Sequence, residues 1–119
     1  MQYLLLIYRD EKLAEKAAPS DLETMMKEYG EFTQGIVKSG QFRAGDALQP
    51  IRTATTVRVR EGKAVTTDGP FAETKEQLGG YYMVEAKDLD EAIRIAARIP
   101  SARDGSIEIR PVRPMPKAS

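Results

Sequence analysis

Cysteine, histidine and tryptophan are all absent from the 119-residue chain. Without cysteine, the chain has no disulfide framework, no thiol nucleophile and no thiolate ligand for a metal. Without histidine, it lacks the Ser-His-Asp and Cys-His catalytic arrangements and the usual zinc sites. Acid–base chemistry is left to carboxylates, tyrosine, lysine and arginine, and no motif in the chain indicates a metal or an organic cofactor.

An excess of charge of either sign is also missing, because 18 Lys and Arg residues balance 18 Asp and Glu residues. A formal charge of zero provides no broad electrostatic field for nucleic acid or for an anionic membrane, so we expect neither as a partner. The apolar run at residues 4–7 is too short to span a membrane and lacks the basic region of a signal peptide. A cytoplasmic location is therefore expected.

The length of the chain fits one domain, which we expect to cover residues 1–112. The proline-containing tail, residues 113–119, is expected to fray because proline cannot continue a sheet ladder. Apolar periodicity and turn residues predict the elements in between. We expect strands at 2–8, 55–60, 63–67, 78–86 and 106–112, helices at 20–39 and 88–99, and an irregular stretch at 41–54 that contains a short strand at 42–44.

Both predicted helices carry start and stop signals. Ser20 with Glu23, and Asp88 with Glu91, have capping-box spacing, and Gly40 is placed to end the first helix in a left-handed conformation. The first helix also carries an apolar stripe that is expected to pack into the core. This stripe, in which the two methionines are interpreted as core filler, consists of Leu22, Met25, Met26, Tyr29, Phe32, Ile36 and Val37.

The order of elements predicts an α+β fold of the ferredoxin-like, or split βαβ, type. Strands 2–8 and 78–86 are apolar on both faces, which indicates the two central positions of the sheet. Two helices can cover one face of a sheet, so the second apolar face needs another cover, and we expect a homodimer packed sheet to sheet. The residues expected to be covered by the second copy are Tyr3, Leu5, Ile7, Tyr81 and Met83.

The segment 68–76, with the sequence Asp-Gly-Pro-Phe-Ala-Glu-Thr-Lys-Glu, begins with strong turn chemistry. Phe71 is expected to anchor this segment in the core, and Gly79 with Gly80 suggests a bulge in the following strand. The segment resembles the signature of the YCII-related, or DGPF-motif, proteins. Residues 3–8 and 105–112 resemble the first and last strands of the same family, so the resemblance covers nearly the whole chain.

The resemblance implies a ferredoxin-like fold assembled as a dimeric α/β barrel, in agreement with the pattern of elements. Most members have no assigned activity, and some relatives are associated with extracytoplasmic-function sigma factors. The wider superfamily includes small-molecule isomerases, dehalogenating enzymes and cofactor-free monooxygenases. Related YCII proteins carry a His–Asp pair that this chain cannot form, and Asp104 stands where many DGPF members have a histidine.

Candidate site residues come from the turn segment and from the residues expected around it. Asp68 is a candidate general acid or base, and the alternative is an Asx-turn that holds the loop. Each of the other candidates has a structural alternative, either a solvated surface charge or a core tyrosine with a satisfied hydroxyl. The candidates for ligand binding are Tyr8, Arg43, Asp46, Glu73, Thr74, Lys75 and Tyr82.

Two classes of function remain open from the sequence. The first is a pocket near segment 68–76 that binds or transforms a small organic molecule with acid–base residues and without a cofactor. The second is a non-catalytic interaction module that serves a transcription regulator such as a sigma factor. An enclosed pocket would favour the first class, and an exposed apolar patch without a pocket would favour the second.

Overall fold

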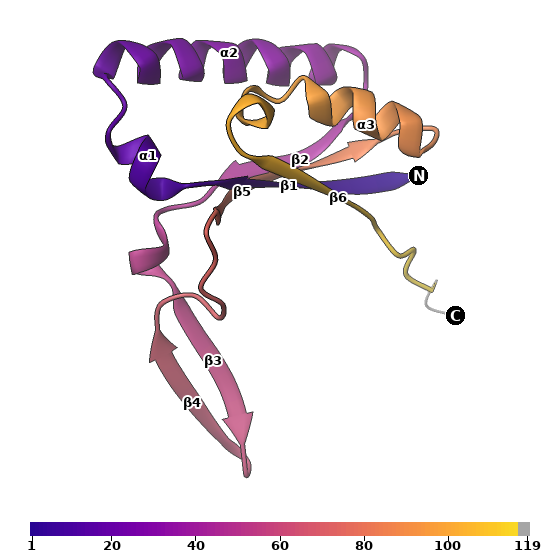
Figure 1. The fold of residues 1–119 in the computed structure, drawn as a ribbon. Helices are drawn as coiled ribbons and strands as arrows, with labels where there is room; N and C mark the ends of the chain where they lie inside the picture. Colours follow the sequence, from indigo (N-terminus) through magenta and orange to yellow (C-terminus); the bar gives the residue numbers. More distant parts are fainter. Residues whose placement is uncertain (117–119) are drawn as a thin grey trace.

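A computed structural model describes residues 1–116 of the chain (Figure 1). The sheet contains four antiparallel strands in the order β2-β5-β1-β6, and β3 and β4 form a separate two-stranded sheet. The elements are β1 (Gln2–Arg9), α1 (Glu11–Glu15), α2 (Pro19–Lys38), β2 (Phe42–Ala47), η1 (Ile51–Thr53), β3 (Thr55–Arg60), β4 (Lys63–Asp68), β5 (Gln77–Glu85), α3 (Leu89–Ala97), η2 (Pro100–Arg103) and β6 (Ser106–Pro111).

The fold is α+β and consistent with the ferredoxin-like plan, with β1 and β5 in the two central positions as predicted. Helices α2 and α3 cover one face of the four-stranded sheet, and the β3–β4 hairpin projects away from the opposite side (Figure 1). No helix within residues 1–116 is long and apolar enough to cross a membrane. Residues 113–116 contain no helix or strand, and residues 117–119 of the tail that was expected to fray lie outside the described part.

The core lies between the sheet and the two helices. Leu5, Ile36, Val84 and Ile99 have at most 1% of their surface exposed. The ring of Tyr82 packs edge-to-face against that of Phe32, with ring centroids 5.1 Å apart. This packing holds the second half of α2 firmly against the sheet.

One prediction about the edge of the sheet was wrong. The strand beside β5 is β2, a longer version of the short strand expected at 42–44, and the hairpin that was expected in the sheet forms a sheet of its own. The sequence of β2 does not show a regular alternation of apolar and polar side chains. Its register shifts between Phe42 and Ala44, and Gly45 contributes no side chain. A side chain at position 45 would collide with the Tyr82 ring, since a Cβ there would lie 2.7 Å from Cδ1.

The assignment of residues to the two faces of the sheet also needs correction. Tyr3, Leu5 and Ile7 are buried under the helices and not on the open face. The reason is the register of β1 against β5, which pairs Leu4 with Met83 and Leu6 with Tyr81. The open face is therefore formed by side chains that are half-buried in the single chain, namely Leu4, Leu6, Tyr8, Tyr81 and Met83.

Helix α2 differs from its prediction at its start. It begins at Pro19 after the N-cap residue Ala18, and no side chain caps it, so the capping box expected at Ser20 is absent. Proline at the first helical position presets the backbone angle and needs no donor there. The end of the helix is as predicted, because Gly40 has a φ of 78°. Asp88 also caps α3 as predicted, since its side chain accepts a hydrogen bond of 2.9 Å from the Glu91 amide.

The apolar stripe of α2 is buried only in its second half. Phe32 and Ile36 are buried, whereas Met26 is 76% exposed and Met25 is half-buried. The interpretation of the two methionines as core filler is therefore wrong. Helix α3 fills the space beneath the second half of α2 and leaves the first half standing away from the sheet (Figure 1).

Segment 68–76 turns as predicted, with Gly69 at a φ of 97°. Phe71, however, is 76% exposed and lies beneath the Arg58 guanidinium, 5.2 Å from the ring centroid. The expectation that Phe71 anchors the segment in the core is wrong, because the segment follows a hairpin that points away from the core (Figure 1). The bulge expected near Gly79 is confirmed, since the register of β1 against β5 shifts there.

Candidate functional site

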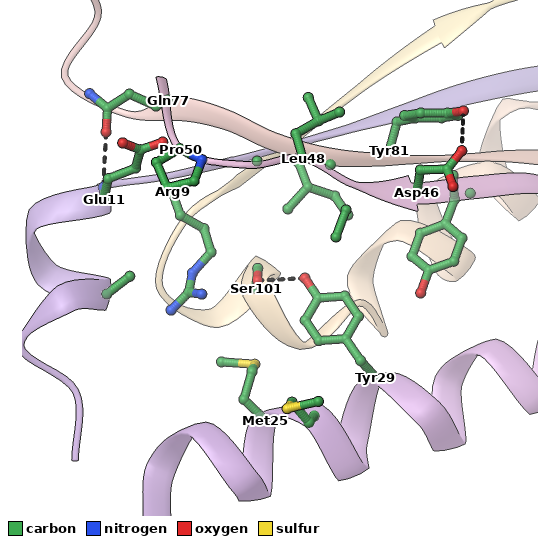
Figure 2. A pocket seen from close by; sticks show the side chains of 18 of the residues that line it. Arg9, Glu11, Met25, Tyr29, Asp46, Leu48, Pro50, Gln77, Tyr81 and Ser101 are labelled. Atoms are coloured by element: carbon green, nitrogen blue, oxygen red, sulfur yellow. Dashed lines mark hydrogen bonds between the residues drawn. The ribbon is translucent and has the colours of Figure 1, made fainter. Parts of the chain in front are cut away.

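A cavity of about 670 Å³ lies between the first half of α2 and the helix-covered face of the sheet (Figure 2). It occupies the space that the lifted half of α2 leaves open. Its wall is contributed by α1, α2, η2, the ends of β1, β2 and β5, and the segment that follows β2. The apolar part of the wall is formed by Ile7, Met25, Met26, Phe42, Leu48 and Pro50.

A pair of hydroxyls forms one polar point of the wall. The Tyr29 hydroxyl lies 2.5 Å from the Ser101 Oγ, and Ser101 is fully buried at the start of η2 (Figure 2). Burial raises the pKa of Tyr29, although its hydrogen bond with Ser101 and the charge of Arg9 act in the opposite direction. Tyr29 is therefore protonated at neutral pH and has a proton to donate.

Arg9 supplies a positive charge beside this pair. It is the last residue of β1, and its guanidinium points into the cavity (Figure 2). Its ion-pair partner is Asp104, at 3.5 Å between Nη2 and Oδ2, with 28% of the Arg9 side chain and 53% of the Asp104 side chain exposed. Gly105 makes this neighbourhood possible, because a Cβ at that position would lie 2.1 Å from the Tyr8 carbonyl oxygen.

Two acidic residues in the wall are engaged by other groups of the protein. The Glu11 carboxylate accepts a hydrogen bond of 3.1 Å from the Ile51 amide, and the Glu11 amide donates to Gln77 Oε1 at 2.9 Å. The Asp46 carboxylate accepts a hydrogen bond of 2.7 Å from the Tyr81 hydroxyl, so it is turned to the open face of the sheet and away from the cavity (Figure 2). This hydrogen bond raises the pKa of Tyr81, because it favours the protonated phenol.

A second hydroxyl pair connects α2 with β5. The Thr33 Oγ1 lies 2.6 Å from the Tyr82 hydroxyl and also donates to the Tyr29 carbonyl at 2.8 Å. Both side chains line the cavity. The interpretation of Tyr82 as a core tyrosine with a satisfied hydroxyl is confirmed, since its ring is buried and its hydroxyl has a partner.

The structure brings together two of the residues that were proposed from the sequence, Asp46 and Tyr82, in the wall of this cavity. Tyr8 lies on the other face of the sheet, where burial and the negative charge of Glu108 raise its pKa. Arg43 is exposed and donates to the Gly40 carbonyl at 2.7 Å.

The remaining predicted site residues are exposed on the hairpin and the segment after it, away from the cavity wall. These are Asp68, Glu73, Thr74 and Lys75. Within residues 1–116 the Asp68 carboxylate accepts no hydrogen bond, so the Asx-turn is not formed, and Thr74 donates to the Glu76 carbonyl. The described residues also contain no group of three or more Asp and Glu side chains that could hold a metal ion.

Sequence reasoning missed the three polar residues at the centre of the cavity. Tyr29 was assigned to the core stripe of its helix, and Arg9 and Ser101 lie in short charged or polar stretches that carry no motif. A usable signal was the position of an arginine at the end of a strand that is otherwise apolar on both faces, because the register places it beside the covered face.

The family model of the YCII-related domain matches residues 1–116. The chain belongs to the YCII-related family. An uncharacterized protein of Rhizobium meliloti (strain 1021) is similar to this YCII-related chain, with 35% identity over 114 residues, which cover 94% of the chain and 92% of the relative. The family expected from segment 68–76 and the two terminal strands is thereby confirmed.

Proposed function

We propose that this YCII-related protein binds a small organic molecule in the cavity between α2 and the sheet. The observation that supports this function is a concave space of about 670 Å³ whose wall is largely apolar and which holds Arg9, Tyr29 and Ser101 close together (Figure 2). Pockets for small ligands are typically of this size, with a few polar groups that orient the ligand.

The location differs in detail from the pocket expected near segment 68–76. Residues Gln77, Gly79 and Gly80, which directly follow that segment, line the cavity, whereas Asp68 does not. Any acid–base step on a bound molecule therefore falls to the groups of the cavity itself, of which Tyr29 is held protonated by burial. Asp68→Ala serves as a variant that should leave binding unchanged.

The proposal is tested with a thermal-shift screen of small acids, amides, phenols and lactones against three proteins. Ala47 lines the cavity, so Ala47→Trp fills part of it, and Ala97→Trp places the same indole on an exposed position of α3 outside it. A ligand that binds the native state at 100 times its Kd raises the free energy of unfolding by about 2.7 kcal/mol. We expect such a ligand to raise the unfolding temperature of the wild type and of Ala97→Trp, and to leave that of Ala47→Trp unchanged.

A ligand that stabilises all three proteins equally would place the site elsewhere, and a library without any stabilising compound would contradict the proposed function. In that second case the interaction-module hypothesis becomes the better account. Its supporting observation is an exposed apolar set on and beside the hairpin, which consists of Val57, Val59, Val65 and Phe71.

We also propose that the protein works as a homodimer in which the open faces of two sheets pack together. The support is the apolar composition of that face, which no helix within residues 1–116 covers (Figure 1). The residues expected at the centre of the interface are Leu4, Leu6 and Met83, in place of the set inferred from the sequence. The cavity lies on the other face of the sheet, so it stays open in such a dimer.

A further inference from the structure

The charges in the cavity wall are distributed unevenly. Among the described residues that line it, Arg9 alone is basic, and its guanidinium points into the space (Figure 2). A guanidinium has five N–H donors in a planar fork. Within residues 1–116 little of this capacity is used, because Arg9 makes a single side-chain contact, with Asp104 at 3.5 Å, and Asp104 is itself 53% exposed. Arg9 therefore offers most of its donors to whatever enters the cavity.

The hydroxyl pair adds another donor near the same place. Tyr29 and Ser101 have two hydroxyl protons between them but share one hydrogen bond of 2.5 Å, so one proton is left for a third group. Figure 2 shows the Arg9 guanidinium on the same side of the cavity as this pair, and its positive charge lowers the pKa of Tyr29 against the effect of burial. A planar fork of N–H groups next to a hydroxyl donor matches the two oxygens of a carboxylate.

The acidic and apolar side chains in the rest of the wall are unfavourable for a second negative charge on the ligand. Glu11, Glu15 and Asp46 all line the cavity. Glu11 already accepts a hydrogen bond from the Ile51 amide, so it is held in place as a fixed acidic group, whereas Asp46 turns its carboxylate to the Tyr81 hydroxyl on the open face. A ligand with a second anionic group would place it near Glu11 and Glu15 or in contact with the methionine side chains of α2, and both positions are unfavourable.

We infer that the cavity takes a monocarboxylic acid with an apolar body, whose carboxylate lies at Arg9 and the Tyr29–Ser101 pair. The apolar body lies along Met25, Met26 and Leu48. This inference rests on the proposed function and narrows it to one chemical class. It excludes dicarboxylic acids and phosphate monoesters, whose second charge has no partner in the wall.

The test uses three probes of equal chain length, octanoate, its neutral amide octanamide, and the dicarboxylate octanedioate, in calorimetric titrations at pH 7. On the wild type, octanoate is expected to bind about tenfold or more tightly than either of the others, because charge-assisted hydrogen bonds are the stronger ones. Arg9→Gln should lower the affinity for octanoate by a similar factor and leave the affinity for octanamide unchanged. Arg94→Gln removes the same charge from an exposed position of α3 and should change neither.

The outcomes separate this inference from the proposed function. Equal affinity of the wild type for octanoate and octanamide, with both lost in Ala47→Trp, would overturn the carboxylate preference and leave the cavity as a binding site. Octanedioate binding as tightly as octanoate would overturn the preference for a single charge. If neither these probes nor any screened compound binds, both proposals fall. Should Arg9→Gln fail to fold, the comparison of octanoate with octanamide on the wild type decides the question.

Discussion

At the scale of single residues, the polar end of the cavity is assembled from three separate parts of the chain. Arg9 ends the first strand, Tyr29 lies in the middle of α2, and Ser101 follows Pro100 near the C-terminus. Each of these residues depends on another one for its place. Ser101 is fully buried and relies on Tyr29 for the hydrogen bond of its hydroxyl, so the pair behaves as a unit.

Removal of one hydroxyl of this pair should lower the free energy of unfolding by more than the loss of one hydrogen bond alone. Tyr29→Phe leaves the buried Ser101 hydroxyl without a partner, and we expect the free energy of unfolding to fall by about 1–2 kcal/mol. Ser101→Ala should lower it by a similar amount. The double variant should lose clearly less than the sum of the two single losses, because it leaves no unpaired hydroxyl. Strictly additive losses in urea unfolding would contradict the coupling.

Prediction from the sequence was least successful at this scale. Asp46 and Tyr82 were proposed as ligand-binding residues and do line the cavity, whereas the structure places Arg43 and Asp68 outside it. Local chemistry, such as a turn or a strand, is readable from neighbouring residues. The meeting of Arg9 with Tyr29 and Ser101 depends on the tertiary arrangement of three distant segments, which no local pattern contains.

At the scale of elements, α2 has two different halves. Its second half packs on the core through Phe32 and Ile36, and its first half forms one wall of the cavity. An ion pair ties the helix to η2, with 2.7 Å between Arg103 Nη1 and Glu28 Oε2. This contact connects the helix that carries Tyr29 with the segment that carries Ser101.

The ion pair gives a pH-dependent contribution to stability. The hydrogen bond from Arg103 lowers the pKa of Glu28 below its ordinary value of 4.5. A group whose pKa is lowered in the folded state stabilises that state above the ordinary pKa, and it loses this effect as the pH falls through the lowered value. Glu28→Gln should therefore unfold at a lower temperature than the wild type at pH 7, and this difference should shrink and disappear on acidification below pH 4.5.

Glu31→Gln is the control for this measurement, because Glu31 is exposed on the same helix and forms no ion pair within residues 1–116. Its unfolding temperature should follow that of the wild type at every pH. A constant difference between Glu28→Gln and the wild type from neutral to acidic pH would show that the ion pair does not account for the effect.

Most elements of the fold could be predicted, and the errors have physical causes. The two central strands were recognised because they are apolar on both faces, and α3 because of its cap at Asp88. Strand β2 was largely missed because a register shift and Gly45 interrupt its alternation. Helix α1 has five residues and gives too short a periodic signal, although Asp10 caps it by accepting from the Lys12 amide at 2.9 Å.

At the scale of the whole molecule, the single chain is less compact than a typical globular domain of the same length. Its radius of gyration is 16.6 Å, compared with about 13.5 Å for a compact domain of this size. The excess comes from the hairpin of β3 and β4, which extends away from the sheet (Figure 1). An isolated two-stranded sheet is marginally stable in water, so both the hairpin and the open face of the main sheet favour assembly with a second copy.

The dimer proposal predicts a specific effect of one charge. Leu6→Lys places an ammonium group on the open face of β1, and burial of that charge in a sheet-to-sheet interface is unfavourable. We expect the variant to sediment as a monomer at concentrations where the wild type is a dimer. Leu89→Lys, on an exposed position of α3, should remain dimeric. A wild type that is monomeric at tens of micromolar would contradict the proposal.

The central claim is that the cavity beneath the first half of α2 is the ligand site. Its most direct test is an NMR titration of the isotope-labelled wild type with octanoate. The account predicts that the amide signals of Gly45, Gly79 and Gly80, which line the cavity, shift progressively to saturation, while those of Gly62 and Gly69 in the hairpin region stay in place. Shifts at the hairpin glycines with unmoved cavity glycines would contradict it.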